Sequence, residues 1–221
     1  MKFSQFAAVS LVVVSGFLLS NASAENSYGD IDKVLGSASV ESGQHYNDIS
    51  VVNGSVKMAS DSSANEISVV NGSIKMGENV SVHSASTVNG SIEADGGLKT
   101  AANLETVNGK IRPGSNAVIG GNVDTVNGDI TLDSSEVAQD VSTVSGDISL
   151  NGTTVIKGDL VYKPRGKRKT FFGWGNDSKP TLHIGADAVV EGRIILQQQV
   201  TLQLDNPAMQ DKVEYQINDG R

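Results

Sequence analysis

The sequence of 221 residues contains no cysteine, only four prolines and few aromatic residues. Without cysteine the chain has no disulfide framework, no thiolate zinc site, no iron–sulfur cluster and no cysteine nucleophile. Basic residues are scarce as well, since 17 Lys and Arg stand against 25 Asp and Glu, a formal charge of −8. Binding to phosphates needs an excess of Lys and Arg, so the composition argues against a nucleic-acid partner.

Long apolar runs are also lacking beyond the N-terminus. Lys2 gives a positive start, residues 6–19 are mostly apolar, and Ala22-Ser23-Ala24 supplies the small residues that a signal peptidase reads. These features predict a signal peptide over 1–24 that is cleaved after Ala24, with an uncleaved anchor as the alternative. The run is shorter than the roughly 20 residues that span a bilayer, so we expect a periplasmic or extracellular protein with no transmembrane segment after signal removal.

The most regular feature of the sequence is the motif Val-Asn-Gly-x-(Ile/Val), repeated every 18 or 19 residues. Helical repeats and propeller blades are much longer than this period, which leaves the coil of a parallel β-solenoid. Full copies start at Val52, Val70, Val88, Val107 and Val126, a copy with Ser for Asn starts at Val144, and a worn copy starts at Val34.

The repeat predicts an all-β, single-stranded parallel β-helix. Coils are expected over residues 34–162 and 181–204, with caps at 25–33 and 205–221, because stacked turns need covered ends. A right-handed coil is favoured over a left-handed one, since the turns of 19 residues break a hexapeptide period.

Side-chain alternation in a strand predicts which repeat positions are buried. The Val and the Ile of each motif are four residues apart, so both are expected to face inward, as Val107 and Ile111 would. The residues just before the Val are expected to form an outward polar column; they are Thr87, Thr106, Thr125 and Thr143.

Stacking also aligns the asparagines of the motif, which are Asn53, Asn71, Asn89, Asn108 and Asn127. Two structural interpretations fit this column. The side-chain amides form a ladder from turn to turn, or Asn-Gly is a tight bend with positive φ.

The Val-x-Gly-x-Ile coils, together with the stretch at 182–194, resemble the repeats of bactofilin-type polymer-forming proteins and of bacterial adhesin-head-like β-helices. The resemblance covers about residues 30–204. It implies a right-handed solenoid without catalytic activity, which in some members assembles end to end, and it transfers no catalytic or binding residue. Bactofilins proper are cytoplasmic, so the predicted signal peptide marks this chain as an exported variant without an implied cytoskeletal role.

Residues 163–180 interrupt the coils with a basic and aromatic insert. The insert carries a charge of +5 and the only Trp, whereas the rest of the mature chain carries −14. One interpretation is a site for an anionic surface, either lipid headgroups or an acidic envelope polymer. The other is a solvated loop whose aromatic residues cover a coil edge. The residues concerned are Lys163, Arg165, Lys167, Arg168, Lys169, Phe171, Phe172, Trp174 and Lys179.

Signals for catalysis are weak in this sequence. The histidines, His45, His83 and His183, have no metal-ligand spacing, and the carboxylates are scattered, so no catalytic residue, metal or cofactor is predicted. We therefore expect an exported structural or adhesive protein of the bacterial cell envelope. Its expected partners are a second copy, end to end, or anionic envelope components. The alternative is a periplasmic or extracellular carbohydrate-active enzyme on a β-helix scaffold.

Overall fold

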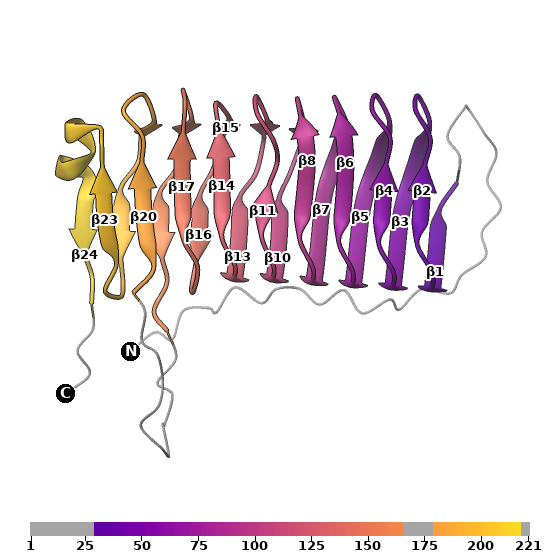
Figure 1. The fold of residues 1–221 in the computed structure, drawn as a ribbon, viewed down its shortest axis with the longest axis horizontal. Helices are drawn as coiled ribbons and strands as arrows, with labels where there is room; N and C mark the ends of the chain where they lie inside the picture. The colour runs from indigo at the N-terminus through magenta and orange to yellow at the C-terminus, as the bar shows by residue number, and fades with distance from the viewer. Residues whose placement is uncertain (1–28, 166–178, 218–221) are drawn as a thin grey trace, which may run out of the picture.

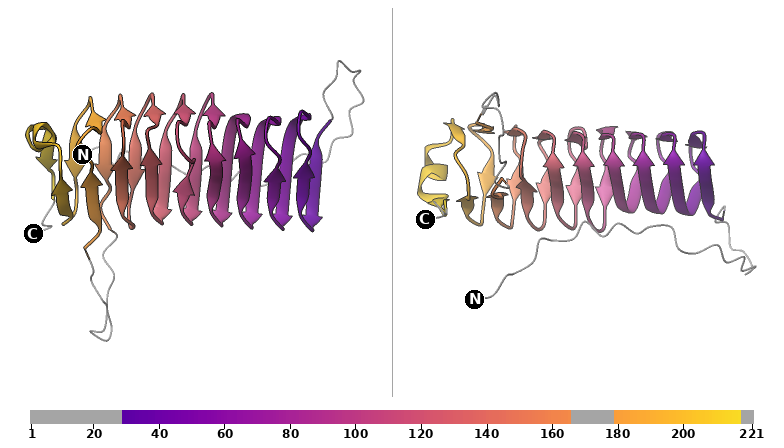
Figure 2. Two further views of the ribbon diagram at one scale, coloured as in Figure 1. Left: turned by 45° about the horizontal axis from the view of Figure 1, so that its top comes forward. Right: turned by 90° about the horizontal axis from the view of Figure 1, so that it is seen from below.

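The computed structural model describes residues 29–165 and 179–217, and these form a stack of about ten turns along one axis (Figure 1). The turned views in Figure 2 show the same stack with strands on its faces and bends at its corners. All strand pairs within the described residues are parallel, because each strand pairs with its equivalent in the next turn. The predicted all-β parallel solenoid is confirmed.

One face is a nine-stranded sheet that takes one strand from each successive turn. At a strand spacing of about 4.8 Å, nine stacked strands extend roughly 40 Å along the axis. The strands are β2 (Ala38–Val40), β4 (Val56–Met58), β6 (Ile74–Glu78), β8 (Ile92–Gly96), β11 (Ile111–Arg112), β14 (Ile130–Asp133), β17 (Ile148–Asn151), β20 (Thr181–Ile184) and β23 (Thr201–Leu204).

The second sheet has 15 strands and divides partway along the stack. Its first strands are β1 (Ile31–Leu35) and the nine-residue strands β3 (His45–Asn53), β5 (Ser63–Asn71) and β7 (Ser81–Asn89). From β7 the sheet continues as two branches, because later turns bend within this stretch. One branch is β9 (Lys99–Thr100), β12 (Val118–Ile119), β15 (Glu136–Val137), β18 (Val155–Ile156) and β21 (Val189–Val190). The other is β10 (Leu104–Asn108), β13 (Val123–Asn127), β16 (Val141–Thr143), β19 (Leu160–Tyr162), β22 (Ile194–Leu196) and β24 (Val213–Tyr215).

The interior is a column of aliphatic side chains, but the prediction of which repeat residues enter it was partly wrong. The Ile of each motif is buried, as at Ile111 and Ile130, whereas Val107 is only half-buried and faces outward. The predicted outward threonines lie inside instead; Thr87, Thr106, Thr125 and Thr143 are all buried. Alternation fails because the chain turns a corner at Asn-Gly, so the residues on either side of the bend follow different strands.

Both interpretations of the asparagine column describe part of this corner. The amides form a ladder, in which Nδ2 of Asn71, Asn89, Asn108 and Asn127 donates to Oδ1 of the asparagine one turn earlier at 2.9–3.0 Å. The positive φ of a tight bend occurs at only two of the glycines that follow the ladder asparagines, +155° at Gly54 and +152° at Gly72, and at none of the asparagines themselves.

The C-terminal end of the stack carries a short 3₁₀ helix, η1 (Pro207–Lys212). Asn206 caps η1 by accepting from the Ala208 amide, and its Nδ2 donates to the Ala188 carbonyl of the preceding turn. Met209 from η1 is buried against the core, and β24 then pairs with β22. The described part of the predicted cap at 205–221 thus consists of η1 and one further solenoid strand.

Candidate functional site

The predicted surface-binding insert begins and ends at one corner of the solenoid. β19 ends at Tyr162 in one sheet, and β20 begins at Thr181 in the other (Figure 1). In earlier turns the Asn-Gly dipeptides make this corner. β19 pairs in register with β16, and β20 with β17, so the coil is continuous on both sides of the insert.

Tyr162 ties the two sides of this corner together. Its side chain is fully buried, occupies the inward column next to Thr143, and is the one tyrosine among the largest fully buried side chains. The hydroxyl donates to the Thr181 carbonyl at 2.9 Å and accepts from the Ile148 amide at 3.1 Å. Burial raises the pKa of the Tyr162 phenol, so this hydroxyl keeps its proton and remains a donor.

Lys163 follows directly at the base of the insert. Its ammonium lies 3.4 Å from Oδ1 of Asp124, which also accepts from the Ser142 hydroxyl. The amide of Gln198 donates to the carbonyls of Lys163 at 2.8 Å and Val144 at 2.6 Å. These contacts fix the backbone where the chain leaves the solenoid, and they show Lys163 paired with an acidic side chain.

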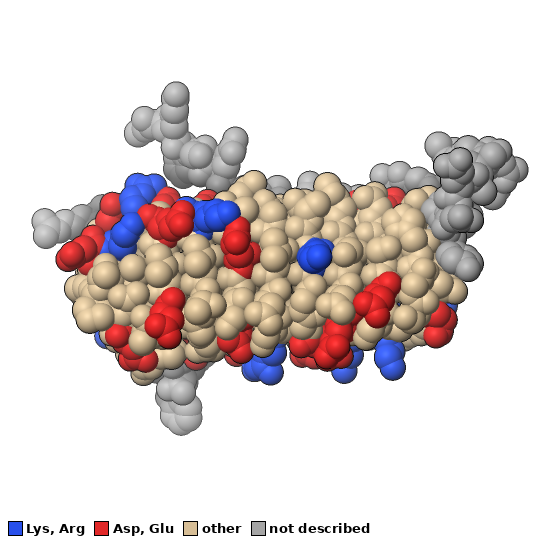
Figure 3. Space-filling model, turned by 90° about the horizontal axis from the view of Figure 1, so that it is seen from above, with Lys and Arg blue, Asp and Glu red and all other residues tan. Residues whose placement is uncertain are grey.

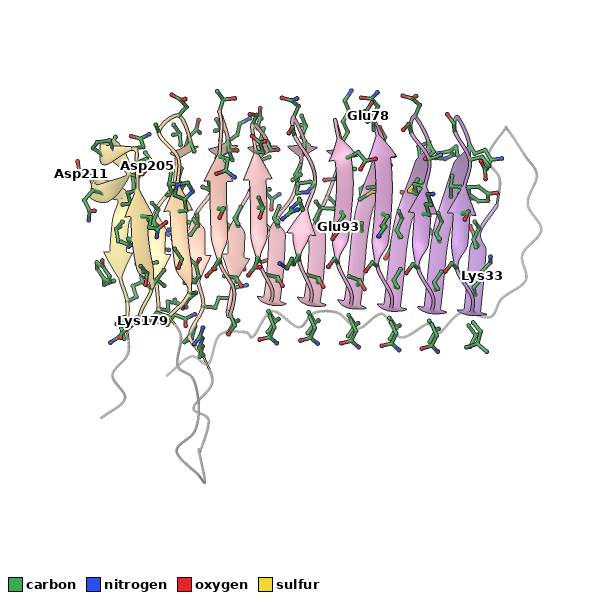
Figure 4. All side chains as sticks on the ribbon, viewed as in Figure 1. Lys33, Glu78, Glu93, Lys179, Asp205 and Asp211 are labelled. Carbon is green, nitrogen blue, oxygen red and sulfur yellow. The ribbon has the colours of Figure 1, made fainter. Side chains whose placement is uncertain are left out.

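The other predicted surface-binding residues divide into two groups. Arg165 and Lys179 are described and exposed, and Figure 4 labels Lys179 beside the start of β20. Lys167, Arg168, Lys169, Phe171, Phe172 and Trp174 lie outside the described residues. The structure therefore describes only the two ends of the insert, and the anionic-surface site stays a prediction.

Two of the three histidines make side-chain hydrogen bonds. Nδ1 of His45 lies 2.8 Å from the Ser63 hydroxyl one turn away. Nε2 of His183 lies 3.1 Å from Oδ2 of Asp205, a residue that Figure 4 labels beyond β23. Ser149 in β17 is in register with His183 on the outer face of the nine-stranded sheet. Within the described residues, no hydrogen bond joins Ser149 to His183.

Ion pairs cluster toward the C-terminal end of the stack, where Figure 3 shows basic side chains beside acidic ones. Nη2 of Arg193 donates to Asp159 at 2.6 Å, and Nη1 lies 3.8 Å from Glu214. The hydrogen bond from Arg193 lowers the pKa of the Asp159 carboxyl. Lys157 pairs with Glu136, which raises the pKa of Lys157. These largely exposed pairs link neighbouring turns but contribute little to stability, because solvent screens their charges.

The contacts of Tyr162 and the burial of the threonine hydroxyls were not predicted from the sequence. One signal was available for Tyr162, since an aromatic residue stands in phase with Thr143 immediately before the insert. In the part of the chain that the structure covers, no group of three or more His, Asp or Glu side chains is placed to hold a metal ion. Residues 29–165 and 179–217 likewise form no helix long and apolar enough to cross a membrane.

Comparison with known proteins gives no relative from which a function can be transferred. No protein-family model, no curated protein and no solved structure matches the chain.

Proposed function

We propose that this chain is an exported structural or adhesive β-solenoid of the bacterial cell envelope and that it has no catalytic activity. One observation carries the proposal: the polar residues of the repeat bind the neighbouring turn. The asparagine amides bind one another, and each serine after the Asn-Gly corner accepts the amide N–H of the next turn, as Ser55 accepts from Ser73 at 3.1 Å. A repeat used in this way builds a rigid rod, and the predicted signal peptide supports export.

A second copy is one proposed partner, because each end of the described stack presents a strand that pairs on one edge alone. Within the described residues β1 pairs only with β3, and β24 pairs only with β22. Leu35 in β1 is 77% exposed and Tyr215 in β24 is 62% exposed. An unpaired strand edge beside exposed apolar side chains favours addition of another strand, so end-to-end contact would continue the same sheets.

Anionic envelope components are the other proposed partner, through the basic insert. Arg165 and Lys179 are exposed where the insert leaves and rejoins the solenoid. Cations near an anionic surface contribute about 1 kcal/mol each, and this attraction weakens as salt is added. The acidic body of the rod is repelled by the same surface, so the protein would bind with the insert facing that surface.

Sedimentation and negative-stain microscopy of the protein lacking residues 1–24, with and without envelope fractions, test both partners. We expect rods that lengthen by end-to-end contact, or salt-sensitive co-sedimentation with acidic polymer or anionic vesicles. The matched control replaces residues 165–174 with a Gly/Ser linker, which should abolish co-sedimentation but leave the fold and rod length unchanged. Short rods at every concentration, with no difference in co-sedimentation between the two proteins, would contradict the proposal.

A carbohydrate-active enzyme of the envelope is the second candidate, favoured by the His183–Asp205 pair with Ser149 in register beside it. A serine activated by a histidine that a carboxylate orients is the arrangement used for acyl transfer, for example in removal of ester groups from a sugar polymer. Assays of the wild type and His183→Ala with acetylated polysaccharides distinguish the two candidates. Activity that depends on His183 would replace the structural proposal.

A further inference from the structure

The sequence contains six Asn-Gly dipeptides, the pair most prone to spontaneous deamidation. The backbone nitrogen of the glycine attacks Cγ of the asparagine, ammonia leaves, and a five-membered succinimide forms. Water then opens this ring to aspartate or isoaspartate. The attack requires a glycine N–H and an asparagine side chain that are both able to move. The six asparagines are Asn53, Asn71, Asn89, Asn108, Asn127 and Asn151.

Five of the six dipeptides lie in the ladder corner, where both reacting groups are held. Each glycine N–H there donates to the carbonyl of the next turn, for example from Gly90 to Asn108 at 3.0 Å and from Gly128 to Ser145 at 2.7 Å. Each asparagine amide takes part in the side-chain ladder, with Oδ1 accepting, Nδ2 donating, or both. Moving the glycine nitrogen toward Cγ would therefore break bonds between turns.

The sixth dipeptide lies at a different corner. Asn151 ends β17 and Gly152 turns the chain away from the nine-stranded sheet at φ +56°. The Asn151 carbonyl accepts from the Ser134 amide at 3.0 Å and the Thr154 hydroxyl at 2.6 Å. Within residues 29–165 and 179–217, neither the Gly152 N–H nor the Asn151 side chain makes a hydrogen bond. Gly152 is exposed and Asn151 is half-exposed, so water reaches both.

We propose that Asn151 is the site at which the folded protein deamidates, and that the solenoid protects the other five Asn-Gly dipeptides. The reaction forms a bond from the Gly152 nitrogen to Cγ of Asn151 and releases ammonia, and solvent water completes the hydrolysis. No enzyme or cofactor takes part.

The modification adds a charge to a corner that is already acidic. Asn151 is in register with Asp133 of the preceding turn. The Asp133 carboxylate accepts from the hydroxyls of Ser115 and Ser134, each at 3.1 Å. A carboxylate at position 151 would face Asp133 from the adjacent strand, and like charges placed opposite each other repel. The folded rod would therefore gain negative charge with age at this one corner.

Incubation of the purified protein at mildly alkaline pH in H₂¹⁸O, followed by peptide mapping and mass spectrometry, tests the assignment. We expect label to enter the folded protein at position 151 at least tenfold faster than at any ladder asparagine. The same protein unfolded in urea should incorporate label at all six sites at similar rates. Asn151→Gln should remove the fast site and leave the ladder peptides unchanged, with circular dichroism confirming the fold.

Two results would overturn the proposal. One is a rate at Asn151 in the folded protein no faster than the rates in the ladder. The other is ladder asparagines that react as fast in the folded protein as in urea, since the sequence alone would then set the rates.

Discussion

Buried threonine hydroxyls distinguish one turn of the rod from the others. Thr87 and Thr106 each donate at 3.0 Å to a corner glycine carbonyl of the preceding turn, and Thr125 donates to a third at 3.3 Å. Thr143 occupies the same column, but its hydroxyl is buried and makes no hydrogen bond within the described residues. Burial of an unpaired hydroxyl is unfavourable, so the turn before the insert contains a local defect.

Thr143→Val should therefore leave the free energy of unfolding unchanged or raise it by about 1 kcal/mol, because it removes an unpaired polar group. Thr106→Val is the matched control. It should lower the free energy of unfolding by about 1 kcal/mol, since the Gly90 carbonyl loses its donor. Urea denaturation measures both variants. A loss of stability in Thr143→Val as large as in Thr106→Val would show that Thr143 has a partner after all.

A charge introduced at an inward position of the motif should lower the stability far more than a charge introduced at an outward position. Ile130 is fully buried, so Ile130→Asp should lower the free energy of unfolding by several kcal/mol by placing an unpaired charge in the core. Val107 faces outward, so Val107→Asp should change it by only about 0.5 kcal/mol. Thermal or urea denaturation of the two variants measures the difference. Equal losses would place Val107 in the core.

The repeat spacing was sufficient to predict the solenoid and its buried Ile positions, but not the side on which every residue lies. The alternation of a strand holds only while the backbone stays extended. An Asn-Gly dipeptide is compatible with a ladder of side-chain amides along an extended strand and with a bend of the backbone. In the structure the ladder and the bend occur at the same corner. Whether the backbone bends between Val107 and Ile111 depends on hydrogen bonds to the neighbouring turns. These bonds cannot be read from the residues of one turn alone.

At the scale of the element, the corner between the two sheets depends on the close approach of glycines. A Cβ added at Gly109 would lie 1.9 Å from the Gly90 carbonyl oxygen, and one at Gly128 would lie 1.8 Å from the Gly109 oxygen. Backbone atoms meet at these points, so a side chain has no room unless the turns separate. Separation would also lengthen the asparagine ladder that runs along the same corner.

Gly109→Ala should accordingly lower the free energy of unfolding by about 3 kcal/mol or more. Gly29→Ala is the control, because no atom of the described residues lies within 4 Å of a Cβ added there. Chemical denaturation of both proteins provides the comparison. Equal stability of the two variants would mean that the stacked corners are looser than the structure shows.

The position and composition of the insert could be predicted from the sequence, whereas the contacts at its two ends could not. Composition identified a basic and aromatic stretch between two coils, and the structure places its two ends at one corner. The pairing of Lys163 with Asp124 could not be foreseen, because 39 positions separate these residues and only the stacking of turns brings them together. The role of Tyr162 was hidden for the same reason, since its partners Ile148 and Thr181 belong to two different turns.

At the scale of the whole molecule, each central turn has a neighbour on both sides, whereas a terminal turn has one. Stability in such a stack is the sum of weak individual turns and of the interfaces between them, so the ends open first. Ile111, Ile130 and Ile148 are fully buried near the middle, whereas Leu35 and Tyr215 are largely exposed at the two ends.

Hydrogen exchange followed by mass spectrometry should therefore show the strongest protection in β11, β14 and β17, decreasing toward β1 and β24. The gradient follows from the missing neighbours, so dilute protein should show it most clearly. If copies join end to end, β1 and β24 gain hydrogen-bond partners, and their protection should rise with protein concentration while the central strands stay unchanged. Uniform protection along the rod in a dilute solution would contradict the view that its stability is the sum of its turns and their interfaces. A gradient that does not depend on concentration would instead show that the ends remain unpaired in solution.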